Sequence, residues 1–407
     1  MACGCIPVPI PQNYSKGFSP FEESHDFFEK YNFIAEWFDP EASFSKKFHL
    51  SYFIKDDSIE LFDLRNLRMF LKRTKCDGVR LCDIYVGASV KIYSRLMKIV
   101  DYADVETKRK LSQTSQKTFG FIKPDGINKK GAIFDMILER GLKVVNLKMV
   151  LMNNDLARRF LRDQFNDYSD ILSHEQILVS GPCILFELIG ENSVQVLKEL
   201  AGPTNPDIAR KEAPTTIRGL FGKDTLHNVL HAAESFEAAG KEAKIFLFGE
   251  PSTLEKNFQP CMTVTNSTFC IIKPHAIQEG LMGKIIAMIE EKNFKVTGMK
   301  MFHLNTAQAE EFLEVYKSVV PEYSGMVSQL SSGPCLAMTV ESESYGPNTP
   351  QEFRNFAGPS DPDIAKELRP NTIRAKFGKD KVKNAIHVTD LPEDAPLEIE
   401  YFFQLLE

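Results

Sequence analysis

The sequence predicts an α+β protein, in which a small antiparallel β domain precedes two tandem ferredoxin-like α/β sandwich domains. Three observations lead to this prediction. Apolar runs of strand length fill residues 31–110, and the motifs of the following segment recur once in the same order. The length of 407 residues also exceeds the ~150 residues that one domain usually holds.

Composition and charge restrict the class of protein. Apolar residues make up 43% and charged residues 26% of the chain, which is typical of globular proteins rather than of disordered or coiled-coil ones. Because no apolar run is long enough to span a bilayer and no signal pattern is present, we expect a cytosolic or nuclear protein without a membrane contact, and we favour a cytoplasmic location. The eight scattered cysteines predict reduced thiols, and a net charge of −6 gives no strong indication of nucleic-acid binding.

The N-terminal part is predicted to hold a tail and a β domain. Residues 1–30 contain several prolines without helical or strand periodicity, which predicts an extended tail. Residues 31–110 alternate strand-length runs with turn pairs such as Asp56-Asp57, and they carry 15 Lys+Arg against 12 Asp+Glu. This mild positive charge indicates either an ordinary mixed surface or a face that docks on an acidic partner such as tubulin.

An internal repeat defines the rest of the chain. Five motifs of the first copy recur in the second: Phe119–Asp125 as Phe269–His275, Ser180–Cys183 as Ser332–Cys335, Ala201–Ala209 as Ala357–Ala365, Thr216–Arg218 as Thr372–Arg374, and Asn228–His231 as Asn384–His387. We therefore expect two homologous domains, at residues 116–248 and 268–407, joined by a linker at 249–267. Within each copy, strand-like runs alternate with helical patterns, as in a split βαβ sandwich.

Each copy also ends in a histidine that follows several groups able to hold phosphate. In order along the chain these groups are Lys123, Lys198, Thr204, Arg218 and Asn228 before His231, and Lys273, Arg354, Ser360, Arg374 and Asn384 before His387. Lysine and arginine form strong charge-assisted hydrogen bonds with phosphate, and a neutral imidazole is a nucleophile near neutral pH. A carboxylate eleven residues further on, Glu242 or Glu398, could hold the other ring nitrogen.

Each of these residues also has an ordinary structural interpretation. A single lysine or arginine is usually a solvated surface charge, and a single histidine is more often structural than catalytic. The glycine, proline and asparagine of the repeated loop can serve as turn residues. However, both copies retain the same polar residue types although many apolar positions around them differ, so we favour an ancestral phosphate site in each copy.

These motifs resemble the nucleoside diphosphate kinase family over about 260 residues, in both copies. The resemblance implies a transfer in which the histidine takes the γ-phosphate of a nucleoside triphosphate and passes it to a diphosphate. It implies that His231 and His387 are the nucleophiles and that Glu242 and Glu398 orient them. It also implies that the ten basic, hydroxyl and amide residues named above, before these histidines, contact the nucleotide. Mg²⁺ would be held only through the phosphates, with no metal ligand from the protein.

The order of a β domain and two such copies resembles the homolog 7 subfamily, with residues 31–110 similar to a DM10 domain. This resemblance implies tubulin and axonemal microtubule inner proteins as partners, and also the γ-tubulin ring complex. It places the protein at the cytoskeleton, cilium axoneme and centrosome. The alternative to an enzyme is therefore a structural scaffold with degenerate kinase domains. An exonuclease activity has no residue signature of its own in this sequence.

Several positions depart from the family pattern. Ala233 and Thr389 stand where the family has a serine near the carboxylate, and Lys198 replaces an arginine. The base-stacking phenylalanine position falls on Asp170 in the first copy and on Glu322 in the second. In the second copy the Lys-Pro-Asp triplet ends in His275, and Pro392 and Pro396 predict a shortened or shifted helix around Glu398. We therefore slightly favour the first copy as the active one.

Overall fold

The computed structural model describes residues 30–39, 44–76, 79–93, 95–114, 116–247, 258–259 and 261–406. The predicted tail lies outside these residues, apart from Lys30. The prediction of a mixed α/β protein with antiparallel sheets is confirmed, because the strands form one six-stranded and one nine-stranded sheet and all their pairings are antiparallel.

The N-terminal β unit is the six-stranded sheet, with the order β4-β3-β2-β1-β6-β5. Its strands are β1 (Lys30–Asp39), β2 (Phe44–Phe53), β3 (Ser58–Asp63), β4 (Arg68–Lys75), β5 (Ser89–Ile92) and β6 (Arg95–Tyr102). Inward-facing residues such as Phe33, Phe48 and Leu50 form a separate buried core. The sequence predicted the strand β6 but not the helix that follows it, α1 (Val105–Thr114). This helix extends past the predicted domain boundary at residue 110 and leads to the next sheet.

The first α/β unit follows the order predicted from the repeat. Its main elements are β7 (Gln116–Ile122), α2 (Lys130–Glu139), β8 (Lys143–Met152), α3 (Asn154–Arg162), α4 (Tyr168–Leu178), β9 (Cys183–Gly190), α5 (Ser193–Ala201), α6 (Pro206–Glu212), α7 (Ile217–Phe221), β10 (Leu230–Ala232) and α8 (Phe236–Phe246). The strand order β10-β7-β9-β8 is that of a split βαβ sandwich. Part of the predicted linker, β11 (Phe258–Gln259), adds to β8.

The second α/β unit repeats this arrangement with the strand order β15-β12-β14-β13. Its main elements are β12 (Ser267–Ile272), α10 (Pro274–Gln278), α11 (Met282–Glu291), β13 (Lys295–His303), α12 (Thr306–Phe312), α13 (Tyr323–Leu330), β14 (Pro334–Glu341), α14 (Thr349–Ala357), α15 (Pro362–Leu368), α16 (Ile373–Phe377), β15 (Ile386–Val388) and α17 (Ala395–Glu400). A π-helical turn, Tyr401–Leu405, follows α17.

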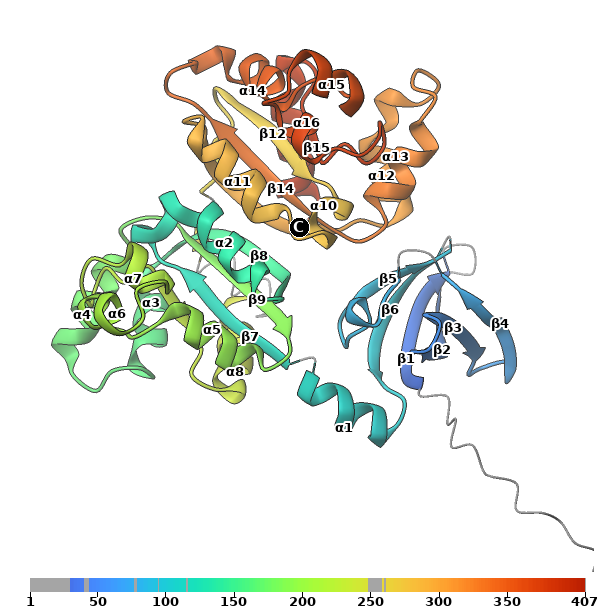
Figure 1. Ribbon diagram of the computed structural model, residues 1–407, viewed down its shortest axis with the longest axis horizontal. Helices are drawn as coiled ribbons and strands as arrows, with labels where there is room; N and C mark the ends of the chain where they lie inside the picture. Colours follow the sequence, from blue (N-terminus) through green and yellow to red (C-terminus); the bar gives the residue numbers. More distant parts are fainter. Residues whose placement is uncertain are drawn as a thin grey trace, which may run out of the picture.

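The two α/β units share one continuous sheet. β8 pairs with β13 through Lys148 and Lys300, and α2 lies against α11 over the junction (Figure 1). Two glycines permit this close approach: a Cβ on Gly131 would lie 2.3 Å from the Ala287 nitrogen, and one on Gly283 would lie 2.3 Å from the Asp135 nitrogen. One apolar core runs through both units on this face of the sheet, whereas the opposite face has a separate core in each unit.

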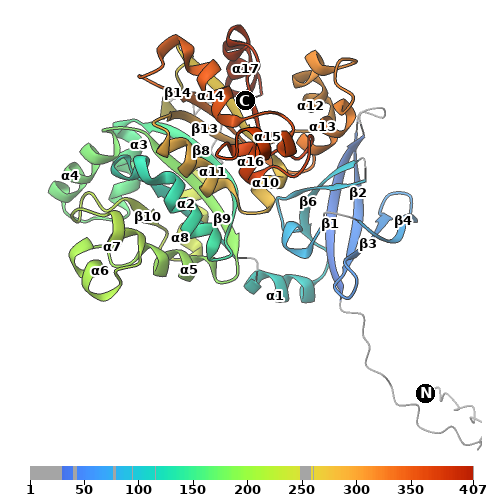
Figure 2. The same ribbon diagram turned by 45° about the horizontal axis from the view of Figure 1, so that its top comes forward.

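The N-terminal β unit contacts both α/β units, and it lies beside α10 and α13 in Figure 2. Lys143 of β8 forms an ion pair with Asp83 at 2.9 Å. Lys91 of β5 donates hydrogen bonds to the Ser328 carbonyl at 3.1 Å and to the Ser331 hydroxyl at 3.1 Å, near the end of α13. Five cysteines (76, 183, 261, 270 and 335) are free thiols, and no helix within the described ranges is long and apolar enough to cross a bilayer.

Candidate functional site

The two repeated histidines lie on three-residue strands, β10 and β15, at opposite ends of the shared sheet. His231 of β10 pairs with Phe121 of β7, and His387 of β15 pairs with Ile271 of β12. Aromatic rings set the plane of each imidazole. Phe121 stacks on His231 with ring centroids 4.8 Å apart, and Phe312 meets His387 edge-on at 5.0 Å.

Both histidines are held through Nε2 by the predicted carboxylates. His231 Nε2 lies 2.8 Å from Glu242 Oε2 on α8, and His387 Nε2 lies 2.9 Å from Glu398 Oε1 on α17. Because a carboxylate only accepts hydrogen bonds, Nε2 carries the proton and donates it in each pair. Nδ1 is therefore the unprotonated nitrogen of the neutral ring, with a lone pair for nucleophilic attack.

The prolines of the second copy do not displace Glu398. The helix is shorter than its counterpart, as predicted: α17 has 6 residues, whereas α8 has 11. However, Pro392 lies in the preceding 3₁₀ turn and Pro396 in the first turn of α17, where a missing backbone N–H interrupts no hydrogen bond. The expected shift of the carboxylate is therefore not seen.

The two copies differ in what holds the second carboxylate oxygen. In the second unit the Thr389 hydroxyl donates to Glu398 Oε2 at 2.6 Å and accepts from the Phe269 backbone N–H at 3.1 Å. In the first unit position 233 is alanine, and Gln164 contacts Glu242 Oε1 at 3.5 Å instead. The threonine therefore takes the place of the serine that the family pattern predicts, whereas the first unit has only a long contact from a residue that the sequence did not indicate.

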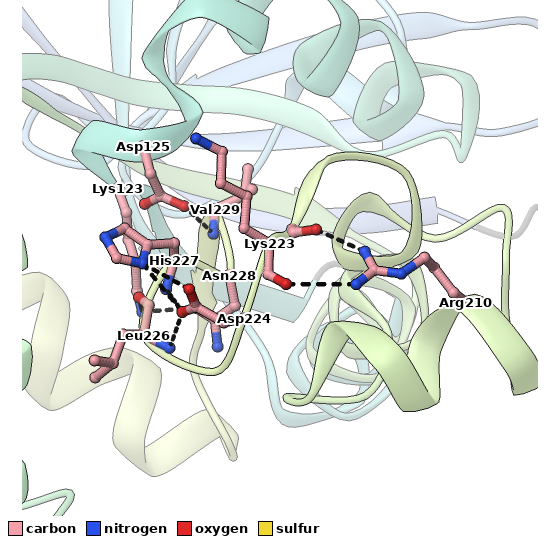
Figure 3. A network of polar contacts seen from close by, with 10 residues as sticks. Lys123, Asp125, Arg210, Lys223, Asp224, Leu226, His227, Asn228 and Val229 are labelled. Carbon is pink, nitrogen blue, oxygen red and sulfur yellow. Dashed lines mark hydrogen bonds and ion pairs between the residues drawn. The ribbon is translucent and has the colours of Figure 1, made fainter.

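The predicted lysine, arginine and asparagine meet beside each histidine. Lys123 donates to Asn228 Oδ1 at 2.6 Å, and Asn228 Nδ2 donates to the Thr204 carbonyl at 3.1 Å. Arg218 donates to the carbonyl of Leu230, the residue before His231, at 2.9 Å. Figure 3 shows Lys123 and Asn228 beside the loop that leads to the histidine strand.

The second unit repeats these contacts. Lys273 donates to Asn384 Oδ1 at 2.7 Å, Asn384 Nδ2 to the Ser360 carbonyl at 2.9 Å, and Arg374 to the Ile386 carbonyl at 3.3 Å. The described contacts of Thr204 and Ser360 are thus made by their carbonyl oxygens. The phosphate contacts of their hydroxyl groups stay a prediction.

A repeated glycine brings the two sides of each site together. Gly202 and Gly358 have φ angles of 80° and 89°, in the left-handed region that favours glycine. A Cβ at these positions would lie 2.2 Å from the hydroxyl oxygen of Thr216 or 2.3 Å from that of Thr372. The Ala-Gly-Pro motif thereby lets its loop approach the helix that carries the arginine, and each arginine donates to the carbonyl of this glycine.

Burial makes both sites receptive to an anion. It lowers the pKa of Lys123 to about 8 and the pKa of Arg218 to about 10. Burial, reinforced by the positive charge of Arg374, lowers the pKa of Lys273 to about 7, and burial also lowers the pKa of Arg374. Two cations held together with little solvent are costly, and a bound polyphosphate would supply the charge that offsets this cost.

Two further predicted cations lie at the edge of these clusters. Lys198 pairs with Glu234 at 2.5 Å, and Arg354 pairs with Asp390 at 3.3 Å. Both acidic residues come three positions after the histidine of their unit. These cations are more exposed than Lys123 and Lys273, and their ion pairs fix them beside the histidine strand rather than in the buried cluster.

The positions expected for base stacking carry acidic side chains in the structure. Glu322 lies 3.6 Å from Lys381 in an ion pair and precedes α13. Asp170 lies in the first turn of α4. Neither residue has an aromatic face, so neither can stack on a nucleobase.

The loop before each histidine has an acceptor that the sequence analysis did not assign. Asp125 Oδ2 accepts a hydrogen bond from the Val229 backbone N–H at 2.9 Å (Figure 3), and His275 Nε2 accepts one from the Ala385 N–H at 3.2 Å. Val229 and Ala385 have positive φ angles of 71° and 72°. Asp125 and His275 occupy the same place in the repeated Lys-Pro-X triplet, and this alignment could have indicated from the sequence that both residues serve as acceptors.

Each α/β unit thus places a carboxylate-held histidine beside a buried cluster of lysine, arginine and asparagine. The sequence model of the family "Nucleoside diphosphate kinase" matches residues 116–251 and 266–407, so the chain belongs to this family. It is also similar over its length to nucleoside diphosphate kinase homolog 7. Identity is 42% to the Rattus norvegicus protein, covering 100% of this chain and 98% of that protein. Identity to the Mus musculus protein is 41%, covering 96% of each chain.

A shorter relative matches a stretch of about the length of one unit. The nucleoside diphosphate kinase of Aquifex aeolicus is 39% identical over 140 residues, covering 34% of this chain and 95% of that protein. A solved structure of the Aquifex aeolicus kinase has a TM-score of 0.32 and 38% identity, covering 35% of this chain and 97% of that chain.

Proposed function

We propose that the chain transfers the γ-phosphate of a nucleoside triphosphate to a nucleoside diphosphate through phosphohistidine, in at least one of its two α/β units. The observation that carries this proposal is the pairing of each histidine Nε2 with a glutamate, at 2.8 and 2.9 Å, beside a buried cluster of lysine, arginine and asparagine. Family membership supports the class of reaction.

The transfer follows from the protonation of the ring. Nδ1 of His231 or His387 attacks the γ-phosphorus, a P–N bond forms, and the bond from the γ-phosphorus to the bridging oxygen breaks. The diphosphate leaves with that electron pair, so no proton is needed from the protein. Glu242 or Glu398 stabilises the positive charge that develops on the ring. A terminal oxygen of the second diphosphate then attacks the phosphorus, and the P–N bond breaks with its electron pair returning to Nδ1, which restores the neutral ring.

The residues present fit Mg²⁺ carried by the nucleotide. The buried cluster offers nitrogen donors, and in the first unit the carboxylates beside it, Glu242 and Asp125, are already bonded to His231 and to the Val229 N–H. Within the described ranges there is no group of three or more His, Cys, Asp or Glu that could hold a metal ion. The phosphates would therefore hold Mg²⁺, which neutralises part of their charge when bound, while Lys123, Arg218 and their counterparts orient the phosphates.

Phosphohistidine formation tests the proposal. The purified chain is incubated with ATP labelled at the γ-phosphate, and acid-labile, base-stable label is measured in the native chain, in His231→Asn, in His387→Asn and in the double variant. We expect each single substitution to remove the label of its own unit and the double variant to carry none. Label that persists in the double variant, or its absence from the folded native chain, would contradict the proposal.

A second candidate function is a scaffold role through the N-terminal β unit. The edge strand β4 exposes basic residues such as Arg68 and Lys72 together with the apolar side chain of Met69. This edge suits an acidic protein surface. We propose tubulin, axonemal microtubule inner proteins or the γ-tubulin ring complex as the partner, and the cilium axoneme or centrosome as the location. The likeness of residues 31–110 to a DM10 domain is part of this proposal.

Charge reversal tests the scaffold role without removing the β unit. Arg68→Glu with Lys72→Glu is expected to weaken cosedimentation with microtubules roughly tenfold, because two favourable surface charges become repulsive. Lys211→Glu with Lys366→Glu, on the exposed faces of α6 and α15, is the matched control. Equal binding of both double variants would exclude β4 as the docking edge.

A further inference from the structure

The clearest difference between the two sites lies in the acceptor behind the histidine loop. In the first unit a carboxylate of Asp125 accepts from the Val229 N–H, whereas in the second unit a histidine ring, His275, accepts from the Ala385 N–H. His275 is 5% exposed and Ala385 is fully buried. An unpaired N–H at this depth would be costly, so the ring acts as an obligatory acceptor.

The hydrogen bonds of His275 define its tautomer. Because Nε2 accepts, a neutral ring carries its proton on Nδ1, which lies 3.1 Å from the side-chain amide of Gln329 on α13. The buried Oε1 atom of Gln329 has no hydrogen-bond partner, so a half-turn of the amide places this oxygen where it accepts from Nδ1–H. Burial lowers the pKa of His275 to about 4, and the nearby charge of Lys273 adds to this effect, so the ring is neutral at neutral pH.

The residue that His275 holds is conformationally strained. Ala385 has a φ angle of 72°, in the left-handed region, and lies at the centre of a three-residue turn in which the Ile386 N–H donates to the Asn384 carbonyl at 3.0 Å, an arrangement that is rare and strained for a non-glycine residue. It lies directly after Asn384, which contacts Lys273, and two residues before His387. A change in the Ala385 backbone would therefore move the amide that orients the phosphate-binding lysine and the strand that carries the nucleophile.

We propose that His275 is a positioning residue for the second unit: as a neutral acceptor fixed by Gln329, it holds Ala385 in the left-handed conformation that aligns Asn384 and His387. The effect on catalysis rests on the proposed function, whereas the effect on the loop geometry is independent of it. The same position in the first unit is filled by Asp125, so an aspartate is the natural substitute for the ring. Replacement by alanine, in contrast, leaves the N–H without an acceptor.

Hydrogen exchange and labelling in the full chain test the positioning role together. In His275→Ala we expect the peptide that contains Ala385 to exchange at least about tenfold faster, and the rate of phosphate incorporation at His387 to fall about tenfold to a hundredfold. His275→Asp should restore both to within about threefold. The peptide that contains Val229 and the label on His231 should be unchanged in both variants, which also shows that the chain has folded.

The outcomes separate this inference from the proposed function. Unchanged exchange at Ala385 in His275→Ala would overturn the positioning role, and so would an equal loss of protection in His275→Asp. If His387 takes no label even in the native chain, phosphotransfer by the second unit fails, whereas the exchange of Ala385 still decides whether His275 holds the loop.

Discussion

Glu290→Leu is expected to lower the free energy of unfolding by about 3–5 kcal/mol, because it leaves the buried ammonium group of Lys130 without its counter-charge. Glu290 of α11 accepts from Lys130 at 3.0 Å and from the Gly131 backbone N–H at 3.0 Å, across the junction of the two α/β units. The side chain of Lys130 is only 4% exposed. The lost contacts thus include both an ion pair and the hydrogen bond at the start of α2.

The repeat supplies the variant that should rescue this loss. Leu138 and Met282 occupy the positions equivalent to Glu290 and Lys130, so the other side of the pseudo-symmetric junction is apolar. Replacing a buried ion pair by apolar residues is often neutral, so we expect Lys130→Met with Glu290→Leu to recover most of the loss. Its free energy of unfolding should stay about 1–2 kcal/mol below that of the native chain, because the Gly131 N–H still lacks its acceptor.

Urea unfolding of the native chain, Glu290→Leu and the double variant measures these differences. Glu139→Leu is the control, since Glu139 pairs with Lys284 at 4.0 Å and both side chains are about half exposed. This variant should change stability by less than about 1 kcal/mol. If Glu290→Leu is no more harmful than Glu139→Leu, the buried pair does not hold the junction.

The internal repeat made most of the fold predictable from the sequence. Strand and helix patterns in one copy could be checked against the other, and both copies form the expected strand order. The joining of the two copies was not predictable, because it depends on shape: Gly131 and Gly283 let α2 and α11 approach, but a glycine in one sequence does not reveal what it faces. Helix α1 was missed because it is short and mostly polar, with no long apolar face.

The candidate site was predictable where a contact depends on residues that recur in both copies. The contacts of Lys123, Arg218 and Asn228 with their loop are found again with Lys273, Arg374 and Asn384. Contacts from outside the motifs could not be found in this way. Gln164 lies in the turn after α3 and Gln329 lies in α13, in segments whose sequences differ between the copies, and only the fold brings them to Glu242 and His275.

Glu398→Gln is expected to slow phosphohistidine formation at His387 by about 10²–10⁴-fold, because the new amide favours the wrong tautomer of the ring. The Thr389 hydroxyl donates to Oε2 at 2.6 Å, and its other close acceptor, the Phe269 carbonyl, is further away at 3.4 Å. The amide oxygen of glutamine should therefore face Thr389, and its NH₂ group should face His387 Nε2. Nε2 must then accept, so the proton moves to Nδ1 and occupies the attacking lone pair.

Glu242→Gln is the matched comparison in the first unit, and its effect at His231 should stay within about tenfold. Position 233 is alanine, and Gln164, at 3.5 Å, can turn its own amide to suit either orientation. Thr389→Ala added to Glu398→Gln should recover part of the rate at His387, because the amide is then no longer held in one orientation by the hydroxyl group.

Labelling rates at each histidine measure the effect, and ¹⁵N NMR of the imidazoles reports the tautomer without turnover. Equal losses at both histidines, or an Nε2–H tautomer of His387 in Glu398→Gln, would show that Thr389 does not control the orientation of the carboxylate position.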